Sequence, residues 1–270
     1  MENLINKNAV LTGASRGIGV HIANHLTENG INVLGIARNE SGLKNTQSIV
    51  KNNKGKFTFR VFDLADTLKL KDLVKDIDDV DFLINNAGIE LYKQFENYRL
   101  NEIEKIINVN LLGPIELTRQ LIPKIKKSKG HIINISSLAG KKGVIYNCIY
   151  SATKSGLILW SDALDQELKK DDVGVSVICP GYIAETGMFN DGGYRPPILL
   201  GESNPRKVAF AVIDAIIKNK KEIIINNGPT RLLIAFGQLF PRLGDLIVKW
   251  LGVPNLSKKR TFNPKTIKKL

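Results

Sequence analysis

Three side chains in the middle of the chain have the types and spacing to act on a carbonyl group. Tyr150 and Lys154 are four residues apart at the start of a predicted long helix, so the phenol and the ammonium project from the same face. A free tyrosine has a pKa of about 10, and a cation held nearby favours the phenolate and lowers that value. Ser137 follows the apolar run 131–136, a predicted buried strand whose end would aim the hydroxyl at the mouth of a sheet.

Two hydroxyls and one cation can together hold a carbonyl oxygen and exchange a proton with it. The Tyr-x-x-x-Lys pair is weak evidence when taken alone, because the same spacing arises by chance in many helices. The alternative is a solvated tyrosine beside a surface lysine. The elements around these three residues therefore decide the interpretation.

Length and composition predict one large α/β domain with a substantial core. The chain has 270 residues, and no stretch rich in Pro, Gly and Ser divides it. Its two cysteines suggest no disulfide framework and favour a reducing, intracellular compartment. The first strand begins so near Met1 that we expect no signal peptide, and we expect a cytoplasmic protein.

A glycine-rich turn near the N-terminus predicts a phosphate-binding element. The apolar run 8–11 is followed by the segment 12–19, Thr-Gly-Ala-Ser-Arg-Gly-Ile-Gly, and then by a helical pattern to residue 29. Glycines let the backbone approach a pyrophosphate, and the N–H groups and dipole of a helix start favour the anion. The predicted dinucleotide contacts in this loop are Gly13, Ser15, Arg16, Gly17, Ile18 and Gly19.

The residues after the second predicted strand, 31–37, favour NADP(H) over NAD(H). An acidic side chain at this strand tip suits the ribose 2′-hydroxyl of NAD, whereas an arginine suits the 2′-phosphate of NADP. Here the chain reads Ala37-Arg38-Asn39, with Arg16 in the glycine loop as a second guanidinium. Glu40 lies close enough to keep NAD(H) open as an alternative.

Further polar residues follow predicted strands at what would be the ligand-binding edge of the sheet. Predicted helices over 43–54 and 68–78 precede the predicted strands 57–62 and 82–85. Asp63 and Leu64 follow the first of these strands, and Asn86, Ala87 and Gly88 follow the second. Asn110 interrupts an apolar helix that starts near residue 101. It is either a satisfied core amide or a residue that opens the helical ladder locally and holds a water.

The chain then continues from a sixth strand into an irregular apolar segment. Pro180 and Gly181 follow the strand 174–179, and residues 182–204 are too irregular for a regular element and too apolar for a solvated linker. We predict a mobile substrate lid there. A helix over 205–218 and a strand over 222–225 close the sheet.

With these elements in place, the chain resembles the short-chain dehydrogenase/reductase family over about residues 7–225. The motifs that carry the resemblance, in family order and spacing, are the segment 12–19, Asn85-Asn86-Ala87-Gly88, Asn108-Val109-Asn110, Ser137, Tyr150-x-x-x-Lys154 and Pro180-Gly181. The resemblance implies a single-domain, Rossmann-like, doubly wound sheet of seven parallel strands with helices on both faces. It also implies a homodimer or homotetramer.

The resemblance assigns a role to each candidate residue. Tyr150 gives a proton to the substrate oxygen, Lys154 binds the nicotinamide ribose and lowers the tyrosine pKa, Ser137 orients the carbonyl, and Asn110 holds a relay water. It adds to the cofactor-binding set Asp63, Leu64, Asn86, Ala87, Gly88, Tyr150, Lys154, Pro180, Gly181, Ile183 and Thr186. Thr186 stands one place later than is common in the family. No metal site is predicted.

Residues 229–270 lie outside the family pattern and form a predicted extension to a catalytic domain of residues 1–228. From Pro229 onward there are nine Lys or Arg residues and the single acid Asp245. Apolar residues recur at helical spacing on both sides of Pro241, which predicts basic amphipathic helices. Such helices can lie in a membrane interface. The alternative is that they pack on the subunit or cover the substrate pocket. Charges break the apolar runs, so a spanning helix is not expected. Nucleic-acid binding is not expected either, because the basic end has almost no aromatic residues among its charges.

The sequence therefore predicts an NADP(H)-dependent carbonyl reductase or alcohol dehydrogenase. Its apolar lid and extension favour a lipophilic substrate such as a ketoacyl chain, a steroid or a retinoid-like ketone. The alternative is a cofactor-binding regulatory or scaffold protein that keeps the fold without turnover. The full set of Asn110, Ser137, Tyr150 and Lys154 argues against that alternative.

Overall fold

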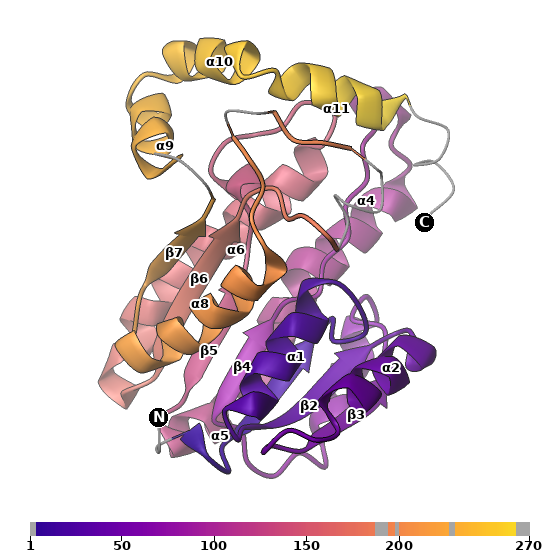
Figure 1. Ribbon diagram of the computed structural model, residues 1–270, viewed down its shortest axis with the longest axis vertical. Helices are drawn as coiled ribbons and strands as arrows, with labels where there is room; N and C mark the ends of the chain where they lie inside the picture. Colours follow the sequence, from indigo (N-terminus) through magenta and orange to yellow (C-terminus); the bar gives the residue numbers. More distant parts are fainter. Residues whose placement is uncertain (1–3, 187–193, 198–199, 227–229, 263–270) are drawn as a thin grey trace.

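A parallel β-sheet forms the centre of the molecule (Figure 1). The computed structural model describes residues 4–186, 194–197, 200–226 and 230–262. Within these residues seven strands pair in parallel in the order β3-β2-β1-β4-β5-β6-β7. They are β1 (Asn8–Thr12), β2 (Asn32–Ala37), β3 (Phe57–Val61), β4 (Phe82–Asn85), β5 (His131–Ile135), β6 (Gly174–Pro180) and β7 (Glu222–Ile225).

Helices cover both faces of this sheet, which explains why its central strands are continuous apolar runs. One face packs against α1 (Ile18–Glu28), α2 (Glu40–Val50) and α8 (Pro205–Lys218), which lie in front of the strands in Figure 1. The other face packs mainly against α3 (Leu70–Val74), α5 (Gly113–Ser128) and α6 (Cys148–Leu168). The predicted doubly wound, seven-stranded fold is confirmed.

Two predicted helices differ from the observed ones at their ends. The helix expected over 43–54 is α2, which begins at Glu40 because the Asn39 side chain caps it by accepting from the Gly42 N–H at 2.8 Å. The helix expected over 68–78 is only α3, preceded by a 3-10 turn (Thr67–Lys69). Acidic residues at 76, 78 and 79 disfavour a longer helix, since negative charge at a helix C-terminus opposes the macrodipole.

The helix expected from residue 101 is interrupted where Asn110 lies. Helix α4 (Leu100–Ile107) runs into a π-helical segment (Asn108–Leu112), which leads directly into α5. A π-turn shifts the hydrogen-bond ladder by one residue and often marks a functional position. The predicted local opening of the ladder at Asn110 is therefore present.

The extension consists of α9 (Thr230–Leu239), α10 (Pro241–Trp250) and α11 (Val253–Thr261). Figure 1 shows α10 and α11 lying across the carboxyl end of the sheet. Helices α9 and α10 form a hairpin in which two glycines are in close contact, since a Cβ built on Gly244 would lie 2.8 Å from the Gly237 Cα. Helix α11 buries Val253, Leu256 and Arg260.

The predicted lid, residues 182–204, is only partly described, since residues 187–193 and 198–199 lie outside the described residues. Its two ends meet at an isolated parallel bridge between Ile183 and Ser203. There the Ser203 N–H donates to the Tyr182 carbonyl at 2.8 Å, and the Ala184 N–H donates to the Ser203 carbonyl at 2.9 Å. The base of the segment is thus fixed beside the end of β6.

A buried polar network joins the two central strands to α6. Asn134 on β5 is fully buried, accepts from Asn85 Nδ2 at 2.8 Å, and donates to Ser161 Oγ at 2.8 Å. Asn85 also donates to Thr118 Oγ1 at 3.2 Å. Buried polar groups need such partners, and these fix the position of α6 relative to the sheet.

We expect Asn134→Ala to lower the free energy of unfolding by about 2 kcal/mol, because it leaves the buried amide of Asn85 and the Ser161 hydroxyl short of a partner. Urea unfolding followed by circular dichroism measures this, with Asn101→Ala, an exposed asparagine on α4, as the matched control. Equal stability of Asn134→Ala and the wild type would show that the network does not stabilise the fold.

Candidate active site

The first two turns of α6 carry the candidate proton donor and its lysine. Tyr150 and Lys154 are 7% and 3% exposed, and both line the same cleft. The Lys154 Nζ donates to the Ile135 carbonyl at the end of β5 at 2.8 Å and lies 5.7 Å from the centre of the Tyr150 ring. The expected shared face is present, and it points into the molecule.

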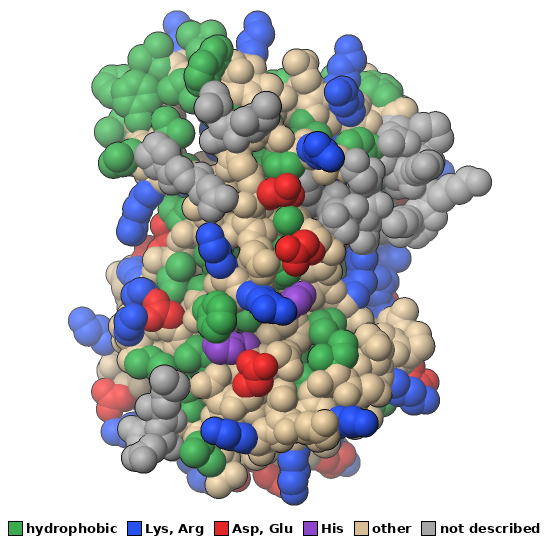
Figure 2. All heavy atoms as spheres, viewed as in Figure 1, with side chains coloured by type: hydrophobic (Ala, Val, Ile, Leu, Met, Phe, Trp, Pro, Cys, Tyr) green, Lys and Arg blue, Asp and Glu red, His purple; other side chains and the backbone are tan. Residues whose placement is uncertain are grey.

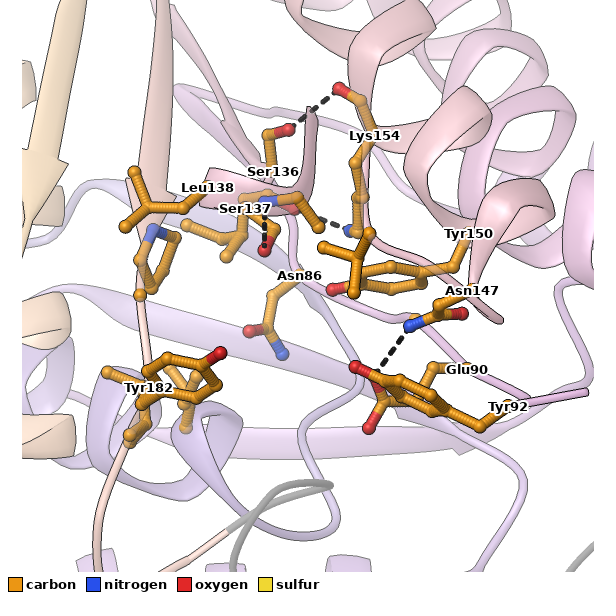
Figure 3. Close-up of a pocket in the computed structure, with 18 of the residues that line it drawn as sticks. Asn86, Glu90, Tyr92, Ser136, Ser137, Leu138, Asn147, Tyr150, Lys154 and Tyr182 are labelled. Atoms are coloured by element: carbon orange, nitrogen blue, oxygen red, sulfur yellow. Dashed lines mark hydrogen bonds between the residues drawn. The ribbon is translucent and has the colours of Figure 1, made fainter. Parts of the chain in front are cut away.

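Two adjacent serines after β5 have different surroundings. The Ser136 hydroxyl is buried and donates to the Lys154 carbonyl at 2.8 Å, so it fixes α6 to the sheet. The Ser137 Oγ accepts from the Ala139 N–H at 3.1 Å. Figure 3 shows the Ser137 and Tyr150 hydroxyls directed into the same space. The geometry supports Ser137 as the residue that faces a substrate oxygen.

Burial dominates the electrostatics of this pair. It raises the pKa of Tyr150, as does the Glu90 carboxylate, while the hydrogen bond with Ser137 and the charge of Arg260 act in the opposite direction. Burial also lowers the pKa of Lys154 to about 8. The lysine was expected to lower the tyrosine pKa, and here the net effect is opposite, because a cleft that disfavours the ammonium disfavours the phenolate as well.

Asn110 lies behind the cleft wall in the π-helical segment and is fully buried. Its Oδ1 accepts from the Ile89 N–H at 2.8 Å, and its Nδ2 donates to the Ile89 carbonyl at 2.8 Å and to Thr153 Oγ1 at 3.2 Å. The side chain is thus a satisfied core amide that ties the segment after β4 to α6. Its role in holding a relay water remains a prediction.

A groove next to this cleft is lined by the glycine loop. The loop residues Gly13, Ser15, Arg16, Gly17, Ile18 and Gly19 all border it. Gly13 has a φ of +71°, and a Cβ there would lie 2.9 Å from the Ala87 Cα, so the close approach requires glycine. Gly17 caps α1 without a side-chain hydrogen bond, so no side chain of the cap competes with an anion for the N–H groups at the helix start. The loop therefore fits a dinucleotide pyrophosphate.

The tips of β2 and β3 form the far end of the groove. Arg38, Asp63 and Leu64 line it, and the Arg38 Nη1 lies 3.5 Å from the Asp63 Oδ2, with both side chains about half exposed. Glu40 pairs instead with Lys44 at 2.8 Å on α2 and does not line the groove. The acidic residue that kept NAD(H) open is thus directed away from the groove.

Asn86 joins the groove to the cleft, since it borders both of them with Ile18 and Gly88. Thr12 Oγ1 accepts from the N–H groups of Asn86 and Ala87 at 3.0 Å each, and the Asn86 Nδ2 donates to the Thr12 carbonyl at 3.0 Å. These bonds hold the ends of β1 and β4 together where the strand order reverses, the usual ligand position in such sheets.

The remaining predicted cofactor residues lie on the opposite wall of the cleft. Pro180 at the end of β6 lines it, and so do Gly181, Ile183 and Thr186 after that strand. Glu185 has a φ of +66°, a left-handed conformation that is uncommon outside glycine, directly before Thr186. Thr186 therefore lies in the cleft despite its position one place later than is common in the family. Its cofactor contact stays a prediction.

Sequence reasoning missed a group of residues on the cleft wall. This group comprises Glu90, Tyr92, Asn147, Tyr182 and Arg260. One signal was present for Arg260: it follows Val253 and Leu256 at helical spacing, which places a charged residue on the buried face of α11. The other four lie next to the family motifs in the sequence and have no pattern of their own. Among the described residues, no three His, Cys, Asp or Glu side chains cluster as a metal site would require.

Comparison with known proteins identifies the family. Residues 7–193 match the family model described as short chain dehydrogenase. The ketoacyl reductase HetN of Nostoc sp. (strain PCC 7120) is 45% identical over 97% of this chain and 95% of its own length. The fatty acyl-CoA reductase of Acinetobacter baylyi is 31% identical over 84% of this chain and 78% of its own length.

A solved structure agrees with these relatives. The crystal structure of a metagenomic short-chain oxidoreductase in complex with NADP superposes with a TM-score of 0.69, at 28% identity over 82% of this chain and 98% of the other. The predicted resemblance is confirmed, and the chain belongs to the short-chain dehydrogenase/reductase family of oxidoreductases.

Proposed function

We propose that the chain is an NADP(H)-dependent oxidoreductase that interconverts a carbonyl and a secondary alcohol on a lipophilic substrate. The observation that carries the proposal is that Ser137, Tyr150 and Lys154 line a cleft continuous with the glycine-loop groove. A non-catalytic scaffold would not need these three groups together. Membership in an oxidoreductase family also favours the enzyme.

Three residues of the cleft, Ser137, Tyr150 and Lys154, have different roles in the proposed reaction. A bound nicotinamide would supply or accept the hydride. In the direction of reduction, the Ser137 hydroxyl orients the carbonyl oxygen, and Tyr150 donates its proton to that oxygen as the negative charge develops. Lys154, which lies under the phenol ring, supplies the nearby cation that stabilises the phenolate left behind.

Apolar groups on the cleft wall favour a lipophilic substrate. Leu138, Val144, Ile183 and the rings of Tyr92 and Tyr182 border the space in front of Tyr150. The names of two relatives, a ketoacyl reductase and a fatty acyl-CoA reductase, are consistent with an acyl chain. We therefore place ketoacyl compounds ahead of steroids and retinoid-like ketones as the substrate class.

We expect Tyr150→Phe to lower the rate of NADPH oxidation with a panel of ketones by about 10²–10⁴-fold, because the proton donor is removed. Absorbance at the reduced nicotinamide band measures turnover, and NADPH fluorescence should show that binding is kept. Tyr146→Phe, outside the cleft, is the matched control. Unchanged turnover in Tyr150→Phe would remove this residue from the mechanism.

Arg38 and Arg16 at the groove support the preference for NADP(H), since the groove offers two guanidiniums and Glu40 turns away. We expect NADPH to bind more tightly than NADH, and Arg38→Ala to weaken NADPH about tenfold while changing NADH little. Fluorescence titration of both cofactors measures this, with Lys51→Ala, exposed at the end of α2, as the control. NADH binding as tightly as NADPH would contradict the assignment.

We also propose that the α9–α10 hairpin contacts an anionic membrane surface. No helix in the described part of the chain has the length and apolarity to cross a bilayer. The hairpin nevertheless exposes large apolar side chains, including Leu239 and Trp250 at 75% each and Leu246 at 61%. Figure 2 shows such side chains gathered at the corner where the hairpin lies, with basic side chains along the top edge. Arg231, Arg242 and Lys249 of the hairpin are exposed among them.

We expect the full-length chain to co-sediment with vesicles containing phosphatidylglycerol at low salt, and less at high salt, because each basic residue near the surface adds about 1 kcal/mol. Replacing Leu239, Leu246 and Trp250 together by Gln should reduce co-sedimentation at least tenfold. The control replaces Ile49, Leu68 and Ile217, which are 51%, 86% and 53% exposed and lie outside the hairpin, by Gln. Equal sedimentation of the two triple variants would exclude the hairpin as the contact.

Two further assignments belong to this proposal. Residues 1–228 form the catalytic domain and 229–270 the extension, joined through the buried side chains of α11.

The chain forms a homodimer or homotetramer. Exposed apolar side chains on α4, the π-helical segment and α6 support the assembly, and these are Leu100, Ile107, Leu112 and Leu159.

A further inference from the structure

A buried ion pair in the cleft wall joins two parts of the chain that are 170 residues apart. The Arg260 Nη2 on α11 donates to the Glu90 Oε1, which lies after β4. The two side chains are 6% and 13% exposed. Both residues line the cleft that holds Tyr150. The last helix of the extension therefore supplies a charged group to the active site.

Other contacts fix both partners of this pair. The Arg260 Nη1 donates to the Tyr92 hydroxyl at 3.0 Å, and its guanidinium lies 4.1 Å from the centre of the Tyr92 ring. The Asn147 Nδ2, at the start of α6, donates to the Glu90 Oε2 at 3.3 Å. Figure 3 shows Glu90, Tyr92 and Asn147 grouped beside Tyr150. The carboxylate is thus held between α11 and the helix that carries the proton donor.

Stability alone does not account for such a pair. Removing two charges from water costs about as much as their attraction returns, so a buried ion pair contributes little net stability. Removing one partner, by contrast, leaves an uncompensated charge in the cleft. What the pair determines is the charge next to Tyr150.

The groups facing Tyr150 act in opposite directions. The Glu90 carboxylate and the Tyr92 phenol raise the pKa of Tyr150, whereas Arg260 and the Ser137 hydrogen bond lower it. Lys154 lies under the ring. Tyr182 lies across the cleft, where the charges of Arg260 and Glu90 act on its pKa in opposite directions. Glu90 is the carboxylate in this set, and Arg260 is the cation that contacts it.

We propose that Arg260 is a positioning residue of the active site. Its guanidinium, on α11, neutralises the Glu90 carboxylate, so that Tyr150 exchanges its proton beside an ion pair and not beside a lone carboxylate. The inference rests on the proposed oxidoreductase function. Residues 253–261 are then part of the catalytic unit. The two parts of the extension have different roles, since the α9–α10 hairpin faces outward and α11 completes the cleft wall.

The test compares full-length Arg260→Met, Glu90→Gln and the double variant with the wild type. Lys258→Met, exposed on the same helix, is the matched control. The rate of oxidation of a secondary alcohol, chosen as the reduction product of the ketone that the wild type turns over fastest, is measured against pH. In this direction the phenolate of Tyr150 is the base, so activity rises with pH through the phenol pKa.

We expect Arg260→Met to lower kcat at least tenfold with a smaller change in KM, and to move the rising limb up by on the order of one pH unit, since a lone carboxylate disfavours the phenolate. Glu90→Gln should move the limb the other way. The double variant, which carries no charge at either position, should recover kcat to within threefold of the wild type, and Lys258→Met should match the wild type throughout.

A pH profile unchanged in both single variants, or a double variant as impaired as Arg260→Met, would overturn the inference and leave Arg260 a packing residue. If Arg260→Met does not fold by circular dichroism, the opposite shift in Glu90→Gln and the recovery in the double variant decide the question. A wild type that turns over no ketone of the panel overturns the proposed function, and this inference with it.

Discussion

The candidate active site depends on burying two ionisable side chains where β5 meets α6. Lys154 donates to the carbonyl of Ile135, and Ser136 donates to the carbonyl of Lys154, so strand and helix are joined in both directions. Both Tyr150 and Lys154 lose hydration there, which disfavours the charged form of each. Proton transfer needs such a place, because electrostatic interactions are stronger away from water and donors stay in position.

The core supports this arrangement with polar contacts that are themselves buried. Asn134 and Ser161 tie α6 to the sheet, and Asn110 ties α6 to the segment after β4. Thr12 and Asn86 connect the ends of β1 and β4 at the reversal of strand order. Each bond contributes little net free energy, yet leaving any of these groups unpaired is costly, so together they specify one arrangement of the helices around the cleft.

The extension directs one part of its chain outward and another part into the cleft wall. Its hairpin presents apolar and basic side chains outward, while α11 turns Arg260 inward against Glu90 and Tyr92. A segment that looks uniformly basic and amphipathic is therefore divided at Gly252, the N-cap of α11, into an outward hairpin and an inward helix. The alternatives of covering the pocket and facing a membrane concern different helices, so they are compatible with each other.

The sequence by itself determined the sheet and the glycine loop, and it predicted the candidate catalytic and cofactor residues that line the cleft and the groove. Each of these is encoded by local patterns: apolar runs for strands buried on both faces, glycines where a Cβ would clash, and the four-residue spacing of Tyr150 and Lys154 on a helix. Only the tertiary structure decided that Glu90 meets Arg260 and that Glu40 turns from the groove to Lys44. It also decided the sign of the shift in the Tyr150 pKa. These outcomes depend on burial and on contacts between distant segments, and local spacing carries no information about either.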